Sequence, residues 1–426
     1  MRHPRDRSFF QGSMDRREFL KRSATTGLAF SSLGAFLAAC GKAPPANLTP
    51  SSSASKLPFP LARPNHPVTW PIYPDNQPIA SGLSPESNAT FKIYNWDQYI
   101  DTTLTKKFGK EFKCKVEIST FASVDEGLSK LHTGQVDFDV YFPDPSLIGK
   151  LITAKLLRPL NHDYIPNLKN LWPSLQDPFY DKGSLYTIPY TIYTTGIGWR
   201  NDHVKDDIAA MANPYETFWN TAYKGKIHLL DDYRETIGMA LLKNGHIDLN
   251  TEDQKLVNLA KDDLLKLIPA VNVKLDTNDY QDLPEGGAWL HQSWSGDLVS
   301  AQYYLPKGVP VDVLSYWYPP NGGGAIGSDN IVALTSGKNP VLAHEFLNFM
   351  LDNDNAYFNM SDFNGYQPPI SFINPDKLVS DEVVPANLKS AVVRPEDFDK
   401  GYIYLELSPN GDAMWHSAYQ ELQAGV

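Results

Sequence analysis

The alternation of short apolar strands with amphipathic helices after residue 90 most restricts how this chain can fold. Strands separated by helices pair in parallel through right-handed crossovers, so the alternation predicts an α/β fold with mostly parallel sheets. The strands expected from the pattern are Phe91–Tyr94, Lys115–Phe121, Phe138–Phe142, Tyr186–Trp199, Ile227–Leu230 and Asn330–Leu334. The expected helices are Leu104–Phe112, Ser123–His132, Thr236–Lys243, Asp253–Leu267 and Ala343–Leu351, with another beginning near Gly296.

The length of 426 residues exceeds the roughly 100–200 residues of one domain, so two lobes are expected. We predict a first lobe from residues 90–195 and 327–352. The second lobe is predicted from residues 196–326 and 353–426. Residues 41–89 contain eleven prolines and five charged residues, a composition typical of an extended tether.

The first forty residues have the features of an export signal. Arg16 and Arg17 precede the mostly apolar stretch Leu28–Ala39, a pattern that resembles the twin-arginine (Tat) signal, although Asp15 replaces the usual Ser or Thr. Residues 1–13 add nothing to this signal, so Met14 is a candidate start. An amphipathic helix with two arginines is the alternative interpretation.

Cys40 follows Leu37-Ala38-Ala39 and precedes Gly41, which resembles a bacterial lipobox. We therefore predict that the signal ends at Cys40, which then carries lipid. The uncharged stretch Ser23–Ala39 is shorter than the about 20 apolar residues of a membrane-spanning helix, so only a lipid anchor is expected. Cys114 is the one other cysteine, which leaves no disulfide framework.

The formal charge of −11 is unevenly distributed. Residues 1–39 carry seven Lys/Arg and three Asp/Glu, a net of +4, so the remaining residues sum to −15. No basic block follows the N-terminal region, which excludes a nucleic-acid partner. An acidic body slightly favours cationic ligands.

Local signatures of enzymes, metals and cofactors are missing from the sequence. The histidines are never closer than eighteen residues, from His228 to His246, which excludes a local zinc motif. The acids of Asp276–Asp282 have calcium-like spacing, but Gln281 stands where the loop needs glycine. The sequence has no G-x-S-x-G and no phosphate-binding G-K-[ST]. We therefore expect no enzymatic activity, no metal and no cofactor.

Acids beside aromatic residues at predicted strand ends carry the functional signal. They occur in Asn95–Tyr99, Asp231–Glu235 and Trp294–Asp297. A buried ammonium needs carboxylates to replace its water, and flat aromatic faces attract cations and methylene chains. Each pair alone more often reflects a tryptophan packed beside a helix cap, and it is their recurrence in one chain that favours a binding site.

With these residues the sequence resembles the spermidine/putrescine-binding proteins of bacterial ABC importers, from about Phe91 to the C-terminus. The landmarks are Ile93–Tyr99, Gly134–Val140, Ser184–Tyr190, Tyr223–Lys226, Leu229–Glu235, Trp294–Asp297, Ser328–Asn330 and Gly365–Tyr366. The resemblance implies two α/β lobes of the type II periplasmic-binding-protein fold, which close on a ligand by hinge motion. It also implies a monomeric, extracytoplasmic substrate-binding protein that delivers a polyamine to a permease.

The family's site residues are carried over where the motifs match. The implied ligand contacts are Trp96, Asp97, Gln98, Tyr99, Asp232, Glu235, Trp294, Asp297, Asp329 and Tyr366. Asp232 and Glu235 would face one ammonium and Asp329 the other, while the aromatic residues would line the methylene chain.

Two departures bear on which amine is preferred. Asp144 adds an acid where the family has Ser and an aromatic, and we include it among the site residues. Gly327 replaces a tryptophan, which we expect to remove one aromatic wall. The alternatives are the same fold with another amine or an amino-acid derivative as ligand, or an exported hydrolase.

Overall fold

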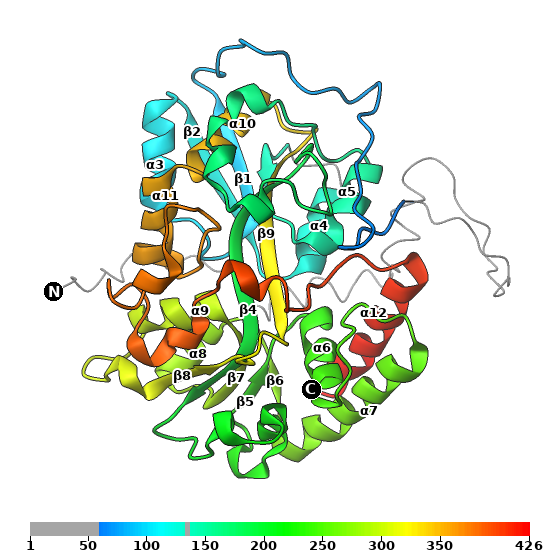
Figure 1. Cartoon of the computed structure of the whole chain (residues 1–426), viewed down its shortest axis with the longest axis vertical. Helices are drawn as coiled ribbons and strands as arrows, with labels where there is room; N and C mark the ends of the chain where they lie inside the picture. The colour runs from blue at the N-terminus through cyan, green and yellow to red at the C-terminus, as the bar shows by residue number, and fades with distance from the viewer. Residues whose placement is uncertain (1–58, 133–136) are drawn as a thin grey trace, which may run out of the picture. The chain divides into compact units, whose positions relative to one another are not determined.

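The computed structural model of the protein describes residues 59–132 and 137–426 (Figure 1). Three predicted features lie outside these residues: the signal, residues 41–58 of the tether, and the landmark residues 134–136. The strands are β1 Thr90–Trp96, β2 Lys115–Phe121, β3 Val140–Tyr141, β4 Ile188–Arg200, β5 Ile227–Leu229, β6 Lys274–Leu275, β7 Leu290–Trp294, β8 Leu314–Trp317 and β9 Ala325–Ala333. The helices are α3 Thr102–Glu111, α4 Val124–His132, α5 Ile148–Thr153, α6 Tyr233–Lys243, α7 Gln254–Val271, α8 Asp279–Glu285, α9 Ser295–Ser300, α10 Pro340–Met350, α11 Asn353–Asn359 and α12 Pro409–Gln423.

The strands follow one another in the order β2-β1-β3-β9-β4-β7-β5-β6, with β8 paired to β4. Strands β2, β1 and β3 are parallel and form the sheet of the part we call the first lobe. Strands β7, β5 and β6 are also parallel and form the sheet of the second lobe. The α/β class is therefore confirmed, and the strand order separates two groups of parallel strands.

Two long central strands connect the lobes. β4 pairs antiparallel with β9 along most of its length, then with β7 and β8 toward its C-terminal end, while β9 continues to β3. The sheet is thus mixed rather than mostly parallel. The difference arises because β4 and β9 run between the lobes in opposite directions, which strand-and-helix alternation does not reveal.

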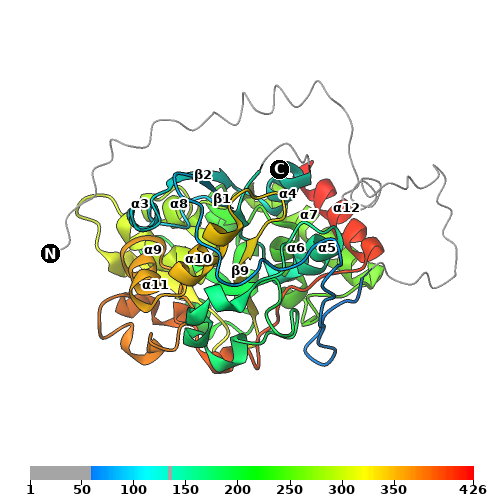
Figure 2. The same ribbon diagram turned by 90° about the horizontal axis from the view of Figure 1, so that it is seen from above.

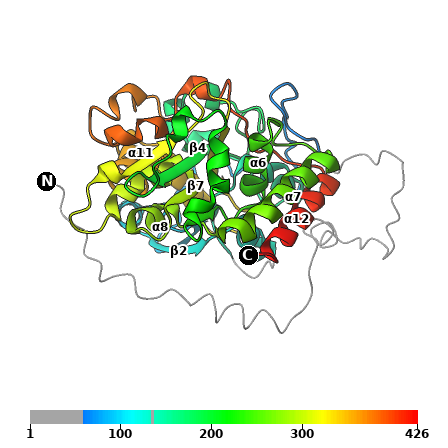
Figure 3. The ribbon, with the colours of Figure 1, turned by 90° about the horizontal axis from the view of Figure 1, so that it is seen from below.

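The helices cover the sheet in two groups. Helices α6, α7 and α12 contact one another on the second lobe, where Figures 2 and 3 show them side by side. Helices α3 and α10 pack together on the first lobe through the rings of Phe108 and Phe346, whose centroids are 5.2 Å apart. Two main hydrophobic cores result, one around Phe91 and Phe346 and one around Ile237 and Trp415. Within the described residues, no helix is long and apolar enough to cross a membrane.

The later part of the predicted tether is packed against the folded body. Trp70 is buried and its indole Nε1 donates to the carbonyl of Tyr180 at 2.7 Å. Phe59 and Val68 are also buried. Any free tether therefore ends before Phe59, and the boundaries proposed for the two lobes stay a prediction.

A buried ion pair joins the two lobes beside the central strands. Lys150 on α5 donates from Nζ to Asp412 on α12 at 2.9 Å, and both side chains are buried. The backbone N–H of Lys150 donates to Glu406 Oε1 at 2.9 Å. Gly149 makes room for this carboxylate, because a Cβ there would lie 2.1 Å from Glu406 Oε2. The two lobes are therefore in direct contact at this edge of the molecule.

Candidate functional site

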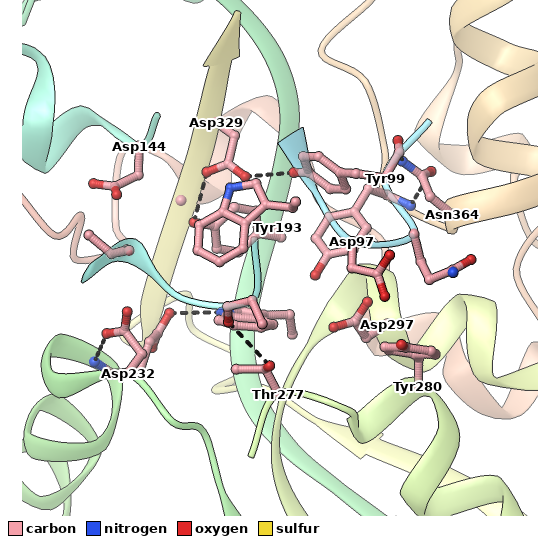
Figure 4. Close-up of a pocket in the computed structure, with 18 of the residues that line it drawn as sticks. Asp97, Tyr99, Asp144, Tyr193, Asp232, Thr277, Tyr280, Asp297, Asp329 and Asn364 are labelled. Atoms are coloured by element: carbon pink, nitrogen blue, oxygen red, sulfur yellow. Dashed lines mark hydrogen bonds between the residues drawn. The ribbon is translucent and has the colours of Figure 1, made fainter. Parts of the chain in front are cut away.

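A cavity of about 140 Å³ lies between the lobes (Figure 4). Its walls include all eleven residues predicted from the sequence, namely Trp96, Asp97, Gln98, Tyr99, Asp144, Asp232, Glu235, Trp294, Asp297, Asp329 and Tyr366. The fold brings them together from both lobes, although the chain separates Trp96 from Tyr366 by 270 positions. Their role as ligand contacts remains a prediction.

Asp232 and Glu235 occupy the start of α6. Asp232 is the N-cap residue, and its Oδ1 accepts from the backbone N–H groups of Arg234 at 2.8 Å and Glu235 at 3.0 Å. Capping by Asp satisfies backbone groups that the helix leaves unpaired, so this carboxylate also stabilises the helix. Burial raises the pKa of Asp232 to about 6, and the charge of Asp144 adds to the effect.

Glu235 is held against two neighbours by one of its oxygens. Oε1 accepts from Thr195 Oγ1 and from the indole Nε1 of Trp294, each at 2.9 Å. Oε2 is buried and has no hydrogen-bond partner among the described residues. Burial and the nearby charge of Asp232 raise the pKa of Glu235 to about 8. This environment favours the protonated form of Glu235 when no cation is near.

Asp329 lies on β9 among tyrosines. Its Oδ2 accepts from Tyr99 Oη at 2.6 Å and its Oδ1 from Tyr193 Oη at 3.3 Å, as the dashed lines in Figure 4 show. Burial raises the pKa of Asp329 to about 7, and the hydrogen bond from Tyr99 partly opposes this shift. The ring of Tyr366 meets that of Tyr99 edge-on, with centroids 5.0 Å apart. Asp329 thus stands at the end of an aromatic wall.

The structure corrects the expectation that Gly327 removes an aromatic wall. Tyr193 on β4 is the cross-strand partner of Gly327 on β9. A Cβ at position 327 would lie 2.5 Å from Cζ of the Tyr193 ring, so the ring occupies the space that the glycine leaves. Tyr193 lines the cavity and contacts Trp294 edge-on, with centroids 6.4 Å apart. The aromatic surface comes from the neighbouring strand.

Asp144 caps a short turn rather than pointing to solvent. Its Oδ1 accepts from the backbone N–H of Ser146 at 2.7 Å, and it lines the cavity. In Figure 4 Asp144, Asp232 and Asp329 lie on one side of the site, whereas Asp97 and Asp297 lie on the other. Asp144 is close enough to raise the pKa values of both Asp232 and Asp329. It is therefore part of the acidic surface of the cavity.

Asp297 lies in the first turn of α9 beside a second buried acid that sequence patterns did not indicate. Burial raises the pKa of Asp297 to about 7. Asp279 is wholly buried, and burial together with the charge of Asp297 raises the pKa of Asp279 well above its usual range. Two such carboxyl groups ionise together only when a cation is near.

Gly296 allows Tyr366 to approach α9. A Cβ at Gly296 would lie 2.3–2.6 Å from three carbons of the Tyr366 ring. Gly296→Ala is therefore expected to lower the free energy of unfolding by about 1–3 kcal/mol through overpacking, and to weaken ligand binding. Gly323→Ala is the matched control, because its Cβ would meet only Tyr402 Oη at 3.6 Å. Urea unfolding measures the difference, and equal stability of both variants would contradict the packing described.

The remaining predicted residues lie at the end of β1 and in the turn after it. Trp96 packs on Phe121 with ring centroids 4.5 Å apart, and its indole donates to the carbonyl of Phe142 at 3.2 Å. Asp97 is exposed, and Gln98 adopts a left-handed backbone conformation with φ of 53°. This turn directs Tyr99 into the cavity, where it reaches Asp329.

The basic side chain of Arg234 is turned away from the cavity acids, although the residue lies in the wall. Its guanidinium donates to the carbonyls of Leu405 at 2.9 Å and Leu249 at 2.8 Å, and it lies over the Trp415 ring. Among the described residues that line the cavity, it is the one Lys or Arg. The cavity consequently offers carboxylates and aromatic faces, a combination suited to cations.

Comparison with known proteins agrees with this chemistry. Over residues 103–385 the chain matches the family described as bacterial extracellular solute-binding protein. It is 30% identical over 351 residues to the spermidine/putrescine-binding periplasmic protein of Escherichia coli K12, an alignment that covers 82% of this chain and 96% of that protein. The putrescine-binding periplasmic protein PotF of the same organism is 28% identical over 287 residues, covering 65% and 77%.

Solved structures share the fold. A putative spermidine/putrescine ABC transporter protein from Listeria monocytogenes superimposes with a TM-score of 0.68 at 26% identity, covering 79% of this chain and 99% of that one. This likeness confirms the two-lobed fold expected from the sequence. The chain therefore belongs to the bacterial extracellular solute-binding protein family, in which the protein binds a solute rather than transforming it.

Proposed function

We propose that this protein binds an aliphatic di- or polyamine outside the cytoplasm and delivers it to an ABC importer. The observation that carries the proposal is the cavity wall, which combines carboxylates on two sides of the site with aromatic rings (Figure 4). One ammonium would lie against Asp232 and Oε2 of Glu235, a buried oxygen with no hydrogen-bond partner among the described residues. The other would lie against Asp329, and the methylene chain would pass Trp294 and Tyr193.

The cavity volume favours a small amine in this closed arrangement. A cavity of about 150 Å³ holds benzene, which has six non-hydrogen atoms. Putrescine also has six, and the cavity here is about 140 Å³. Longer amines would need the lobes to separate slightly, with their additional nitrogen directed toward Asp297.

An amino-acid derivative is the competing ligand class. Its carboxylate would need a basic partner, yet the guanidinium of Arg234 is already held by the carbonyls of Leu405 and Leu249. Bringing a carboxylate among Asp144, Asp232 and Asp329 would add repulsion between like charges. The arrangement therefore favours the amine.

Calorimetric titration of residues 59–426 with putrescine, cadaverine, spermidine, ornithine and glutamate tests the proposal. We expect saturable binding of the unsubstituted amines, weaker binding of ornithine, and none of glutamate. Tight binding of glutamate would contradict the proposal, and so would a failure of every amine to bind.

We further propose that the protein is exported through the signal around Arg16 and Arg17 and anchored by lipid on Cys40. The support is the sequence pattern, together with an extracytoplasmic family. The permease would then meet a monomeric binding protein on the outer face of the cytoplasmic membrane.

The anchor predicts the behaviour of a cysteine variant. Acyl chains bury their methylenes at about 0.8 kcal/mol each, so two or more chains hold a protein firmly to a membrane. Cys40→Ser is expected to move the protein from the membrane fraction to the soluble extracytoplasmic fraction, as fractionation and immunoblotting would show. Cys114→Ser is the control and should remain in the membrane fraction. A Cys40→Ser protein that stays membrane-bound would overturn the lipid anchor.

A further inference from the structure

A second polar cluster lies within the second lobe, on the sheet formed by β7, β5 and β6. His228 on β5 is in register with His291 on β7 and with Lys274 on β6. Partners in register on adjacent strands point to the same face of a sheet, so these three side chains lie in a row. Asp276, directly after β6, and Asp282 on α8 close over them. The chain separates His228 from His291 by 63 positions, so no sequence motif shows the pair.

Each ring nitrogen of His291 lies close to one oxygen atom. Its Nδ1 lies 2.5 Å from the carbonyl oxygen of Gln292, so Nδ1 must carry the hydrogen of that contact. Its Nε2 lies 3.2 Å from Asp276 Oδ1. With the hydrogen on Nδ1, the lone pair of Nε2 points toward Asp276 Oδ1 and is available to a metal ion. A backbone carbonyl on the other ring nitrogen is the usual partner of a metal-binding histidine.

His228 supplies a second nitrogen to the same carboxylate. Its Nδ1 lies 3.0 Å from Asp276 Oδ2 and 3.1 Å from Asp282 Oδ2. Both His228 Nδ1 and Asp276 Oδ2 are buried without a hydrogen-bond partner of suitable geometry among the described residues. Short contacts without hydrogen-bond geometry are what two ligands of one ion would show.

We propose that His228, His291, Asp276 and Asp282 form a binding site for a divalent transition metal ion of the zinc type. Ligand atoms of the first three residues lie within 4.8 Å of one another. Ions of this class bind imidazole nitrogen and carboxylate oxygen at about 2.0–2.2 Å, so small side-chain movements would close the shell. Two histidines and two carboxylates form a neutral complex with a divalent ion, which offsets the cost of burying their charges.

Lys274 holds the place of the cation when no metal is bound. Its Nζ lies 3.1 Å from Asp276 Oδ2 and 2.8 Å from Asp282 Oδ2. Its side chain is 54% exposed, so the ammonium can turn to solvent without burying a charge. Asp282 is partly exposed on the same side, which gives the ion a route of entry.

The site is connected to the solute cavity through the backbone. Asp276 Oδ1 also accepts from the backbone N–H of Asn278 at 3.0 Å, and both Thr277 and Asn278 line the cavity. Metal bound at Asp276 would hold this loop in the position seen here. The inference does not depend on which solute the cavity takes, because its ligands lie outside the cavity wall.

The experiment titrates zinc chloride into the untagged, chelator-treated protein by calorimetry. We expect one zinc ion per chain at micromolar or tighter affinity and an increase in melting temperature. Absence of stoichiometric binding would overturn the proposal.

Variants on the open side of the cluster separate a metal site from a structural salt bridge. Asp282→Asn is expected to weaken zinc binding at least about tenfold. Replacing a residue that only contacts a metal ligand already weakens metal binding by about tenfold or more, and Asp282 is proposed as a ligand itself. Lys274→Met should strengthen zinc binding, because it removes the competing ammonium, whereas in a purely structural network it would only destabilise the fold. His66→Ala, an exposed histidine elsewhere, is the control and should not change the titration. Unchanged zinc affinity in both cluster variants would refute the site.

Discussion

Replacement of Asp329 with asparagine is expected to weaken putrescine binding by about 30- to several-thousand-fold, because losing one partner of a desolvated charge pair costs ~2–5 kcal/mol. Asparagine retains the shape and the acceptor that Tyr99 requires at 2.6 Å, so the fold should survive. Calorimetric titration measures the loss. Asp381→Asn, at an exposed acid outside the cavity wall, is the control and should bind normally. If Asp329→Asn bound putrescine as tightly as the parent protein, the amine would not contact Asp329.

Asp232 allows the charge to be separated from the helix cap. Asn caps a helix about as well as Asp, whereas Ala costs about 0.5–2 kcal/mol of stability. Asp232→Asn should therefore weaken amine binding with little loss of stability, while Asp232→Ala should lose both. If the Asn variant bound putrescine like the parent, the role of Asp232 would be capping alone.

The second large expected effect is that the affinity for the amine decreases as the pH falls. The pKa values of Asp329 and Glu235 are raised to about 7 and about 8 in the unligated protein, mainly by burial. An ammonium binds the ionised carboxylate, so binding expels any proton present. The favourable interaction is complete above these pKa values and is lost as pH falls through them.

The size of this effect follows from the protonated fractions. A group of pKa about 7 is roughly ten times less ionised at pH 6 than at pH 8, and two such groups multiply, so affinity should fall at least about a hundredfold over this range. Titrations at constant ionic strength from pH 6 to 8 measure it, and Glu235→Gln should flatten the dependence. A flat profile in the parent protein would show that these carboxylates are already ionised without ligand, or that they do not meet the amine.

Much of the architecture could be predicted because it is local. β2 has the predicted bounds, and α10, expected over Ala343–Leu351, spans Pro340–Met350. The acids and aromatic residues of the site also follow strand ends and helix starts, as with Asp232 before α6. What was not predicted depends on contacts distant in sequence. The helix Pro409–Gln423 and the strands Leu290–Trp294 and Leu314–Trp317 carry no strong local pattern and are fixed by packing.

The same limit explains the site residues that sequence reasoning missed. Tyr193 lies within a buried strand, so its sequence context indicates a core residue. Only its register opposite Gly327 shows that it lines the cavity. Asp279 follows a short strand and gains its role only because α9 places Asp297 beside it. His228 and His291 are likewise neighbours only through strand pairing. Strand register and helix packing are tertiary properties that one sequence does not state.

The exchange between Gly327 and Tyr193 has a consequence for anyone who redesigns the specificity of this protein. The ring of Tyr193 fills the space in front of Gly327, where a Cβ would lie 2.5 Å from Cζ of that ring. A tryptophan introduced at position 327 would therefore place two large side chains in one volume and displace the hydroxyl that reaches Asp329. The two positions, on different strands, share one volume. They have to be exchanged together, with a small residue entering at 193 as the tryptophan enters at 327.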